Sequence, residues 1–177
     1  MSGYGEQARF LLSTIRHRED IDIYLMNIPW GRCGEISSLD EESVWIKQLL
    51  GKTSAHHKQN QQPSYDVSIQ ITIPNEWENM ANYNIGYTAG IETDRISPLW
   101  IQKSNNMNKI VTISEHSMTG FTKTKYEVAN KQGEIVQILE LETPIEVVGY
   151  SAREPENKEM IDLDLSTDFN FLAVSQF

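Results

Sequence analysis

Apolar residues recur with two different periods along the first 28 residues. Four of them have the spacing of one helix face: Ala8, Leu11, Leu12 and Ile15. This spacing predicts an amphipathic helix over about residues 5–18. Residues 21–28 (IDIYLMNI) form a strand-like run that ends at the turn Pro29-Trp30-Gly31.

The next segment carries the start and stop signals of a helix. Asp40 is placed to cap the free amides of residues 41–50, and Gly51 supplies a C-terminal stop. Leu39 and Val44 have the spacing of a hydrophobic staple. The polar residues 52–64 predict an exposed, mobile connection.

Short apolar runs then alternate with helix signals. We expect strands at residues 67–73, 83–88, 109–113, 145–149 and 169–174. Ser97 followed by Pro98 predicts a helix over about residues 98–106, and residues 114–117 lead into another helix. Between residues 126 and 144 the pattern is weak, and it predicts only a turn at Gln132-Gly133.

This alternation predicts an α/β fold, with a Rossmann-like, mostly parallel sheet and helices on both faces. Such a domain normally opens with a strand, whereas here Gly3, Tyr4 and Gly5 feed the first helix directly. Either a first strand is missing from the chain, which we favour, or the sheet starts at Ile21.

Composition narrows the class of protein. The 177 residues suit one compact domain, and no apolar run approaches the roughly 18 residues of a membrane span. The net charge of −10 argues against binding to a nucleic-acid backbone. Residues 1–10 lack the features of a secretory signal, so we expect a cytoplasmic protein. A single cysteine, Cys33, excludes an internal disulfide and a cysteine-cluster metal site.

Candidate chemistry lies at the predicted turns. Gly3 and Gly5 before a helix start suit either a phosphate or sugar cradle around Tyr4 or an ordinary tight turn. Residues 88–93 (TAGIET) follow a strand at the sheet end where ligands gather. Glu92 is the first candidate there to orient or deprotonate a hydroxyl and Asp94 the second, although pairing with Arg95 explains a carboxylate equally well.

Two further groups follow strands in the same way. His116 lies near a helix start, where local hydrogen bonding competes with substrate contact. Asn75, Glu76 and Trp77 combine amide, carboxylate and aromatic groups that suit a sugar, while Trp77 can equally close the edge of the core. His56-His57 lacks the partners of a metal site, and we expect no metal.

Several segments in this order resemble the acceptor-side domain of the GT-B glycosyltransferases of the group 1 kind. They are GYGEQAR from Gly3, IPNEW from Ile73, NIGYTAGIET from Asn84, SPLWI from Ser97 and SEHS from Ser114. The match covers residues 3–121, and residues 169–177 (FNFLAVSQF) resemble the strand that crosses toward the second domain of this family.

The resemblance implies residues 1–168 as an N-terminal Rossmann-like domain, one half of a GT-B architecture. It implies transfer of a sugar, of hexosyltransferase type, with retention and without a metal or other cofactor. The partners are then a nucleotide-sugar donor, which is a substrate, and a glycan or other hydroxylated acceptor. The site residues implied are Glu92 and His116 for catalysis, and Gly3, Tyr4, Gly5, Asn75, Glu76, Trp77, Thr88 and Asp94 for substrate binding.

The family's donor-binding residues have no counterpart in this sequence. We therefore expect the chain alone to transfer sugar slowly or not at all, with its donor domain beyond residue 177. A homodimer is expected if the sheet edge or the cleft face is exposed. The alternative is a stand-alone α/β module that binds a sugar or nucleotide without catalysis.

Overall fold

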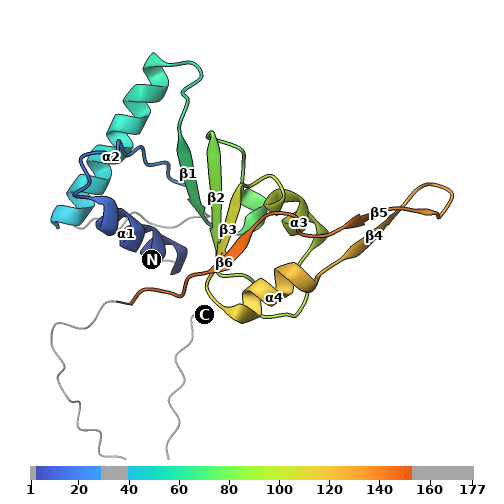
Figure 1. Cartoon of the computed structure of the whole chain (residues 1–177). Helices are drawn as coiled ribbons and strands as arrows, with labels where there is room; N and C mark the ends of the chain where they lie inside the picture. Colours follow the sequence, from blue (N-terminus) through green and yellow to red (C-terminus); the bar gives the residue numbers. More distant parts are fainter. Residues whose placement is uncertain (1–2, 29–39, 153–177) are drawn as a thin grey trace, which may run out of the picture.

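The computed structural model describes residues 3–28 and 40–152 (Figure 1). The turn at Pro29, the thiol of Cys33, the staple residue Leu39 and the expected strand at residues 169–177 lie outside the described residues. The proposed domain boundary at residue 168 also falls outside them.

A four-stranded parallel sheet is the centre of the fold. Its strands are β1 (Val67–Ile71), β2 (Tyr83–Thr88), β3 (Lys109–Thr112) and β6 (Ile145–Val147), paired in the order β1-β2-β3-β6. The expected α/β fold, with a parallel sheet and flanking helices, is confirmed. Each of the four strands lies where the apolar pattern predicted one, with ends that differ by at most two residues.

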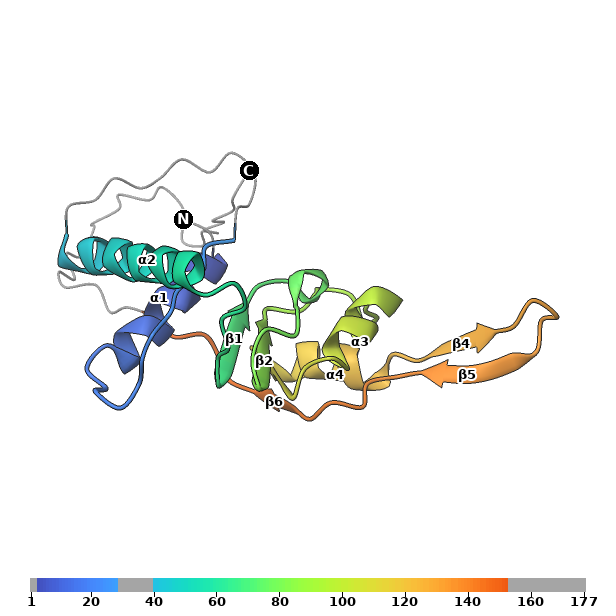
Figure 2. The ribbon, with the colours of Figure 1, turned by 90° about the horizontal axis from the view of Figure 1, so that it is seen from above.

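The connections between these strands run over one face of the sheet. They contain the short 3-10 helix η1 (Pro74–Glu76), α3 (Pro98–Ser104) and α4 (Glu115–Lys123). Right-handed crossovers that advance steadily in one direction place all their helices on the same face. Figure 2 shows α3 and α4 together on one side of the strands, with α1 and α2 on the other.

Side-chain caps start the helices where the sequence predicted. The side chain of Ser97 accepts a hydrogen bond from the amide of Trp100, and that of Ser114 accepts one from Ser117. Asp40 accepts from the amide of Ser43 at 2.7 Å. Each cap satisfies an amide that has no partner within its helix, typically worth about 1 kcal/mol.

The core fills the space between the sheet and the α3/α4 layer. It consists of two clusters of buried residues: Trp77, Met107 and Ile110, and Ile96, Ile101 and Phe121. The opposite face of the sheet is less covered, with Ile69 43% exposed and Tyr83 42% exposed. Packing against α3 and α4 therefore supplies most of the buried apolar area that stabilises the described part of the chain.

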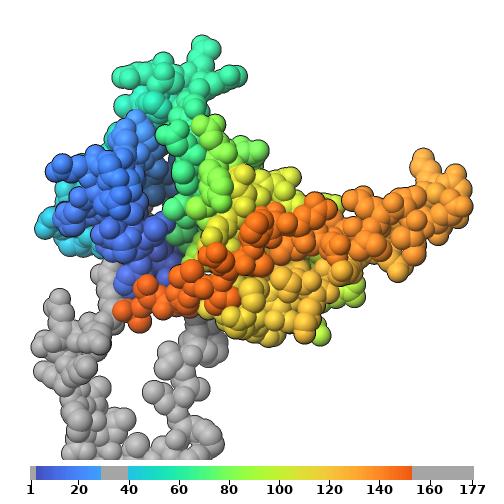
Figure 3. Space-filling model, viewed as in Figure 1, coloured from blue at the N-terminus to red at the C-terminus, as the bar shows by residue number. Residues whose placement is uncertain are grey.

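A β-hairpin projects from the body between α4 and β6. It pairs β4 (Tyr126–Ala129) with β5 (Ile135–Leu139) in antiparallel register and turns at Gly133, which has φ +84°. Figure 3 shows it reaching away from the packed layers. The sequence predicted the turn but neither strand, because both are largely exposed and lack one clear apolar face.

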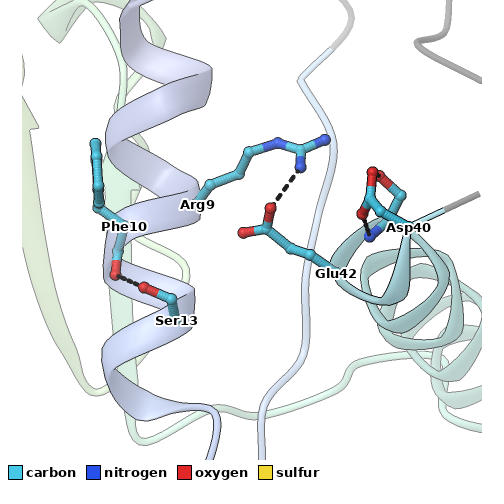
Figure 4. A network of polar contacts seen from close by, with 6 residues as sticks. Arg9, Phe10, Ser13, Asp40 and Glu42 are labelled. Atoms are coloured by element: carbon cyan, nitrogen blue, oxygen red, sulfur yellow. Dashed lines mark hydrogen bonds and ion pairs between the residues drawn. The ribbon is translucent and has the colours of Figure 1, made fainter. Parts of the chain in front are cut away.

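The first two helices pack beside β1 and are tied to each other. α1 (Gly3–Ile15) and α2 (Glu41–Gln59) are joined by an ion pair of 3.0 Å between Arg9 Nη1 and Glu42 Oε2 (Figure 4). The predicted stop at Gly51 is wrong, since α2 continues for eight more residues beyond it. The expected mobile connection at residues 52–64 is consequently helical as far as Gln59.

The continuation of α2 is explained by its contacts with residues 21–28. Thr53 Oγ1 accepts from the amide of Leu25 at 2.8 Å, and Lys52 Nζ donates to the carbonyl of Ile23 at 3.1 Å. The ring of Tyr24 lies 4.6 Å from that of His56. These contacts stabilise the turns of α2 that follow Gly51. Tertiary contacts of this kind override the weak helix propensity of a single glycine.

The expected strand at residues 21–28 is wrong for the described structure. The segment is extended but pairs with no strand among the described residues, and side chains of α2 satisfy part of its backbone instead. An alternating pattern creates a strand only where a neighbouring backbone offers a ladder of hydrogen bonds. Among the described residues the sheet therefore begins at Val67 and not at Ile21.

Candidate functional site

The candidate site lies where the parallel strands end. Three buried threonines mark this edge: Thr72 directly follows β1, Thr88 ends β2 and Thr112 ends β3. In open α/β sheets ligands bind at the carboxyl ends of the strands, where loops lead into helix N-termini. The side-chain hydroxyl of Thr72 has no hydrogen-bond partner among the described residues.

The start of α1 is fastened to the end of β2. The hydroxyl of Tyr4 lies 3.1 Å from Thr88 Oγ1 and accepts a hydrogen bond from the amide of Ala89 at 3.2 Å. Thr88 Oγ1 in turn accepts from the amide of Gly90 at 3.3 Å. Tyr4 and Thr88 are 84 positions apart in the sequence, and their contact holds the first turn of α1 against the loop after β2.

The start of α4 closes the same loop from the other side. Ser117 Oγ donates to the carbonyl of Ala89 at 2.8 Å. Gly90 has φ +81°, and a β-carbon added there would come within 2.5 Å of Ser117 Oγ. Glycine is therefore required at position 90 both by backbone conformation and by the close approach of α4. The N-terminal ends of two helices, with their partial positive charge, meet at one loop.

The two residues expected to be catalytic lie close together, Glu92 on the loop after β2 and His116 in the first turn of α4. The ring Nε2 of His116 is 3.2 Å from the carbonyl oxygen of Glu92, and both residues are exposed. This contact requires a proton on Nε2, because the carbonyl oxygen only accepts. The structure thus brings the His116 ring to the backbone of Glu92, although the sequence placed the two residues only after separate strands.

Arg95 does not neutralise the nearby carboxylates. Its guanidinium donates to the carbonyl of Lys125 at 3.1 Å and lies 4.5 Å from the ring centre of Tyr126. In the described part of the chain it forms no ion pair with Glu92 or Asp94. Both carboxylates are exposed at the surface of this loop.

The expected glycine loop before the first helix is part of the helix itself. Gly3, Tyr4 and Gly5 form the first turn of α1, and a β-carbon at Gly3 would meet no atom within 4 Å. The protein's own packing therefore does not require glycine at position 3. Tyr4 is the member of this group whose side chain contacts the candidate site.

Residues 75–77 are divided between surface and core. Asn75 and exposed Glu76 interact with each other, with Asn75 Nδ2 donating to Glu76 Oε1 at 3.2 Å. Trp77 is fully buried, and its indole Nε1 donates to the carbonyl of Gln70 at 3.1 Å. Of the two interpretations of Trp77, the structural one holds, because a buried ring offers no face to a sugar.

Sequence reasoning missed two tyrosines at the same end of the sheet. Burial raises the pKa of Tyr87 above its ordinary value, with smaller contributions from Tyr150 and Tyr4. Burial likewise raises the pKa of Tyr150, with a contribution from Tyr4. Tyr87 belongs to β2, and Tyr150 to the segment after β6. The sequence shows their positions relative to the predicted strands: Tyr87 directly precedes Thr88, and Tyr150 directly follows the strand predicted at residues 145–149.

Other surface features lie away from this edge. Two shallow hollows occur at the hairpin base, around Tyr126 and Ile138, and at the amino ends of β1 and β2, around Tyr65 and Asn82. Within residues 3–28 and 40–152 no group of histidine, cysteine, aspartate and glutamate has the arrangement of a metal site. The helices of this part are all too short or too polar to cross a membrane.

Comparison of the chain with models of protein families, with curated proteins and with solved structures found no match.

Proposed function

We propose that this chain is the acceptor-binding half of a retaining, metal-independent glycosyltransferase that uses a nucleotide-sugar donor. The observation that supports the proposal is the meeting of α1, α4 and the loop after β2. Tyr4 and Ser117 hold Ala89 from two sides, through its amide at 3.2 Å and its carbonyl at 2.8 Å. Three of the motifs that resemble the family, those starting at Gly3, Asn84 and Ser114, thus meet at this loop, although they are far apart in the chain.

The roles of the residues follow from their positions. The His116 ring contacts the backbone of Glu92 and both residues are exposed, so in this proposal their side chains orient one hydroxyl of an acceptor. In this proposal Asp94, two residues after Glu92, and Asn75 and Glu76, which follow the end of the neighbouring strand β1, supply further hydrogen-bonding groups to the substrate. Tyr4 and Thr88 are engaged with each other, and they support the loop.

Retaining transfer in such a fold needs no strong base from the acceptor half. The donor phosphate takes the proton of the acceptor hydroxyl on the face where the sugar leaves. Glu92 is then an acceptor-positioning residue, and its substitution lowers the rate by misplacing the hydroxyl. The absent opposite wall, with its donor site, belongs to a second domain in this proposal.

The test compares the chain alone with a two-domain protein in which a donor-binding Rossmann-like domain follows residue 177. A panel of monosaccharides and nucleotide sugars is titrated into both while the backbone amide signals of residues 88–94 and 116 are followed by NMR. Sugar release from the donor is measured in parallel, with and without EDTA. Glu92→Gln and His116→Ala are the variants, and Glu127→Gln, on the exposed strand β4, is the matched control.

We expect an acceptor sugar to shift the signals of residues 88–94 in the chain alone, with turnover only in the two-domain protein and no effect of EDTA. Both variants should lower that turnover at least tenfold, and the control should not. Turnover by the chain alone as fast as by the two-domain protein would contradict the half-enzyme. Binding without turnover in either protein would instead support a non-catalytic binding module.

A further inference from the structure

A hollow of about 230 Å³ lies at the amino ends of β1 and β2, at the end of the sheet opposite to the candidate site (Figure 1). Two segments line it, residues 64–65 just before β1 and residues 79–82 just before β2. A hydrogen bond of 2.9 Å from the amide of Asn82 to the carbonyl of Tyr65 joins the two segments. The volume is below the roughly 300 Å³ at which sites for drug-sized ligands begin, so the hollow suits a single small ring.

One buried side chain holds the segment before β2 in place. Asn84 is only 2% exposed, and its Oδ1 accepts from the amides of Met80 and Ala81 at 2.9 and 3.0 Å. Its Nδ2 donates to Asn79 Oδ1 at 2.7 Å and to the carbonyl of Ala81 at 2.8 Å. These four bonds fix residues 79–81 before a ligand arrives, and such preorganisation reduces the entropy that binding costs.

The aromatic ring of the other segment is held by α2 and the extended residues 21–28. The phenol oxygen of Tyr65 lies 2.6 Å from His57 Nε2. The rings of Tyr24 and His56 lie 5.4 and 6.0 Å from that of Tyr65. Because the hydroxyl is already engaged, the group that Tyr65 offers to a ligand is its ring, which contacts apolar surface.

The lining of the hollow is uncharged, although the chain has a net charge of −10. It consists of six residues: Ser64, Tyr65, Asn79, Met80, Ala81 and Asn82. These supply neither the cation that a phosphate requires nor the carboxylates that a metal ion requires. The side chains of Ser64 and Asn82 make no hydrogen bond within the described residues, and both types of group donate and accept. The lining therefore matches a neutral ligand that combines hydroxyl groups with an apolar ring face.

We propose that this hollow binds one ring of a neutral carbohydrate. The ring of Tyr65 contacts the apolar face of the sugar, and Ser64 and Asn82 form hydrogen bonds with its hydroxyl groups. Binding here involves no transfer step. The site is independent of the proposed function, because it lies at the amino ends of the strands and the candidate site at their carboxyl ends.

The test uses the full chain and the methyl glycosides of glucose, galactose and N-acetylglucosamine, with uridine and adenosine as neutral ligands of another class. Each is titrated while the backbone amide signals of residues 79–82 and of residues 88–94 are followed separately by NMR. Saturation of the aromatic protons of the protein identifies sugar protons that approach a ring. One small ring in a shallow hollow binds at about 1 mM or more weakly, so each titration extends well above this concentration.

Two pairs of variants separate the amide from the ring. Asn82→Ala removes an exposed amide side chain, and Asn106→Ala removes another from the turn after α3 as the matched control. Tyr65→Phe keeps the ring and loses only the hydroxyl that contacts His57, whereas Tyr65→Ala loses both. Unfolding in urea establishes that each variant is folded, and Asn82→Ala keeps the test decisive if Tyr65→Ala is not.

We expect at least one sugar to shift the signals of residues 79–82, with saturation transferred to its C–H protons. Asn82→Ala should weaken this binding about three- to tenfold, the loss of one hydrogen bond, while Asn106→Ala leaves it unchanged. Tyr65→Phe should bind as the wild type does, and Tyr65→Ala about tenfold more weakly. Sugar binding at residues 79–82 without any shift at residues 88–94 would support this site and contradict the proposed acceptor site.

Three results would overturn the carbohydrate site. The first is that no sugar shifts residues 79–82; sugar shifts confined to residues 88–94 are of this kind, and they would leave the proposed function intact. The second is a nucleoside that binds at residues 79–82 more tightly than every sugar. The third is equal binding by Asn82→Ala and the wild type.

Discussion

The indole ring of Trp77 lies directly against Gly86, so that a β-carbon at position 86 would come within 2.6 Å of two carbon atoms of the ring. This contact joins the turn after β1 to the middle of β2, and it is completed by the hydrogen bond from Trp77 to Gln70. The side-chain amide of Gln70 also bonds to the backbone of Glu78, at 2.6 and 2.9 Å. The loop that carries Asn75 and Glu76 is held in place by these contacts.

The variant Gly86→Ala should therefore be strongly destabilised. The added methyl group has to displace a fully buried ring, and overpacking of this kind costs about 1–3 kcal/mol or more. Urea unfolding measures the free energy of unfolding. Gly51→Ala is the control, because position 51 is an exposed helical site with open space around it and should gain up to about 1 kcal/mol. Equal stability of Gly86→Ala and wild type would show that Trp77 does not pack as described.

Gly90→Ala should cost more than the backbone strain alone. Gly90 and Gly133 have nearly the same φ, +81° and +84°, but only Gly90 has Ser117 within contact distance. Gly133→Ala thus reports the strain of a left-handed alanine, about 1–2 kcal/mol, and the additional loss in Gly90→Ala reports the clash with α4. Both free energies of unfolding come from urea titrations.

A double variant identifies the origin of that additional loss. Gly90→Ala combined with Ser117→Gly removes the hydroxyl and β-carbon that the new methyl group would meet. We expect the combined change to cost less than the sum of the two single changes. Strict additivity would mean that Ser117 does not limit the space at position 90.

Tyr4→Phe should loosen the first turn of α1 from the strand ends. The variant removes the hydroxyl that contacts Thr88 and accepts from Ala89, a loss of about 1–2 kcal/mol. Hydrogen exchange of the Ala89 amide should become faster in the variant. Tyr83→Phe is the control, since Tyr83 is exposed on β2 and its hydroxyl has no hydrogen-bond partner among the described residues. An unchanged exchange rate at Ala89 would argue against the contact.

Stability should decrease at high pH because of Tyr87 and Tyr150. Burial raises the pKa of both, so the folded state retains protons that the unfolded state releases above pH of about 10. Their contribution is complete below that pH and is lost as the pH rises through the higher folded-state pKa values. Urea unfolding between pH 8 and 11 should show a shallower decrease in Tyr87→Phe/Tyr150→Phe than in Tyr83→Phe. Identical slopes would contradict the raised pKa values.

The sequence by itself determined those elements whose signals are local. Ser97, Ser114 and Asp40 start helices because a cap needs only an amide two or three positions away. The strands β1, β2 and β3 were predicted correctly because short stretches rich in apolar and β-branched residues, bounded by turn signals, are recognised without any distant partner. The same local patterns placed Glu92 and His116 after strands, without showing that they touch.

Tertiary structure decided what depends on partners distant in sequence. Residues 21–28 have the pattern of a strand but no strand beside them, and α2 continues past Gly51 because Lys52 and Thr53 bond to that segment. Trp77 was equally suited to core or surface until Gly86 provided the space for its ring. The contact of Tyr4 with Thr88 was not visible in the sequence, because 84 positions separate the two residues. A sequence pattern encodes which side chains prefer burial, whereas the packing of whole elements selects the neighbours that bury them.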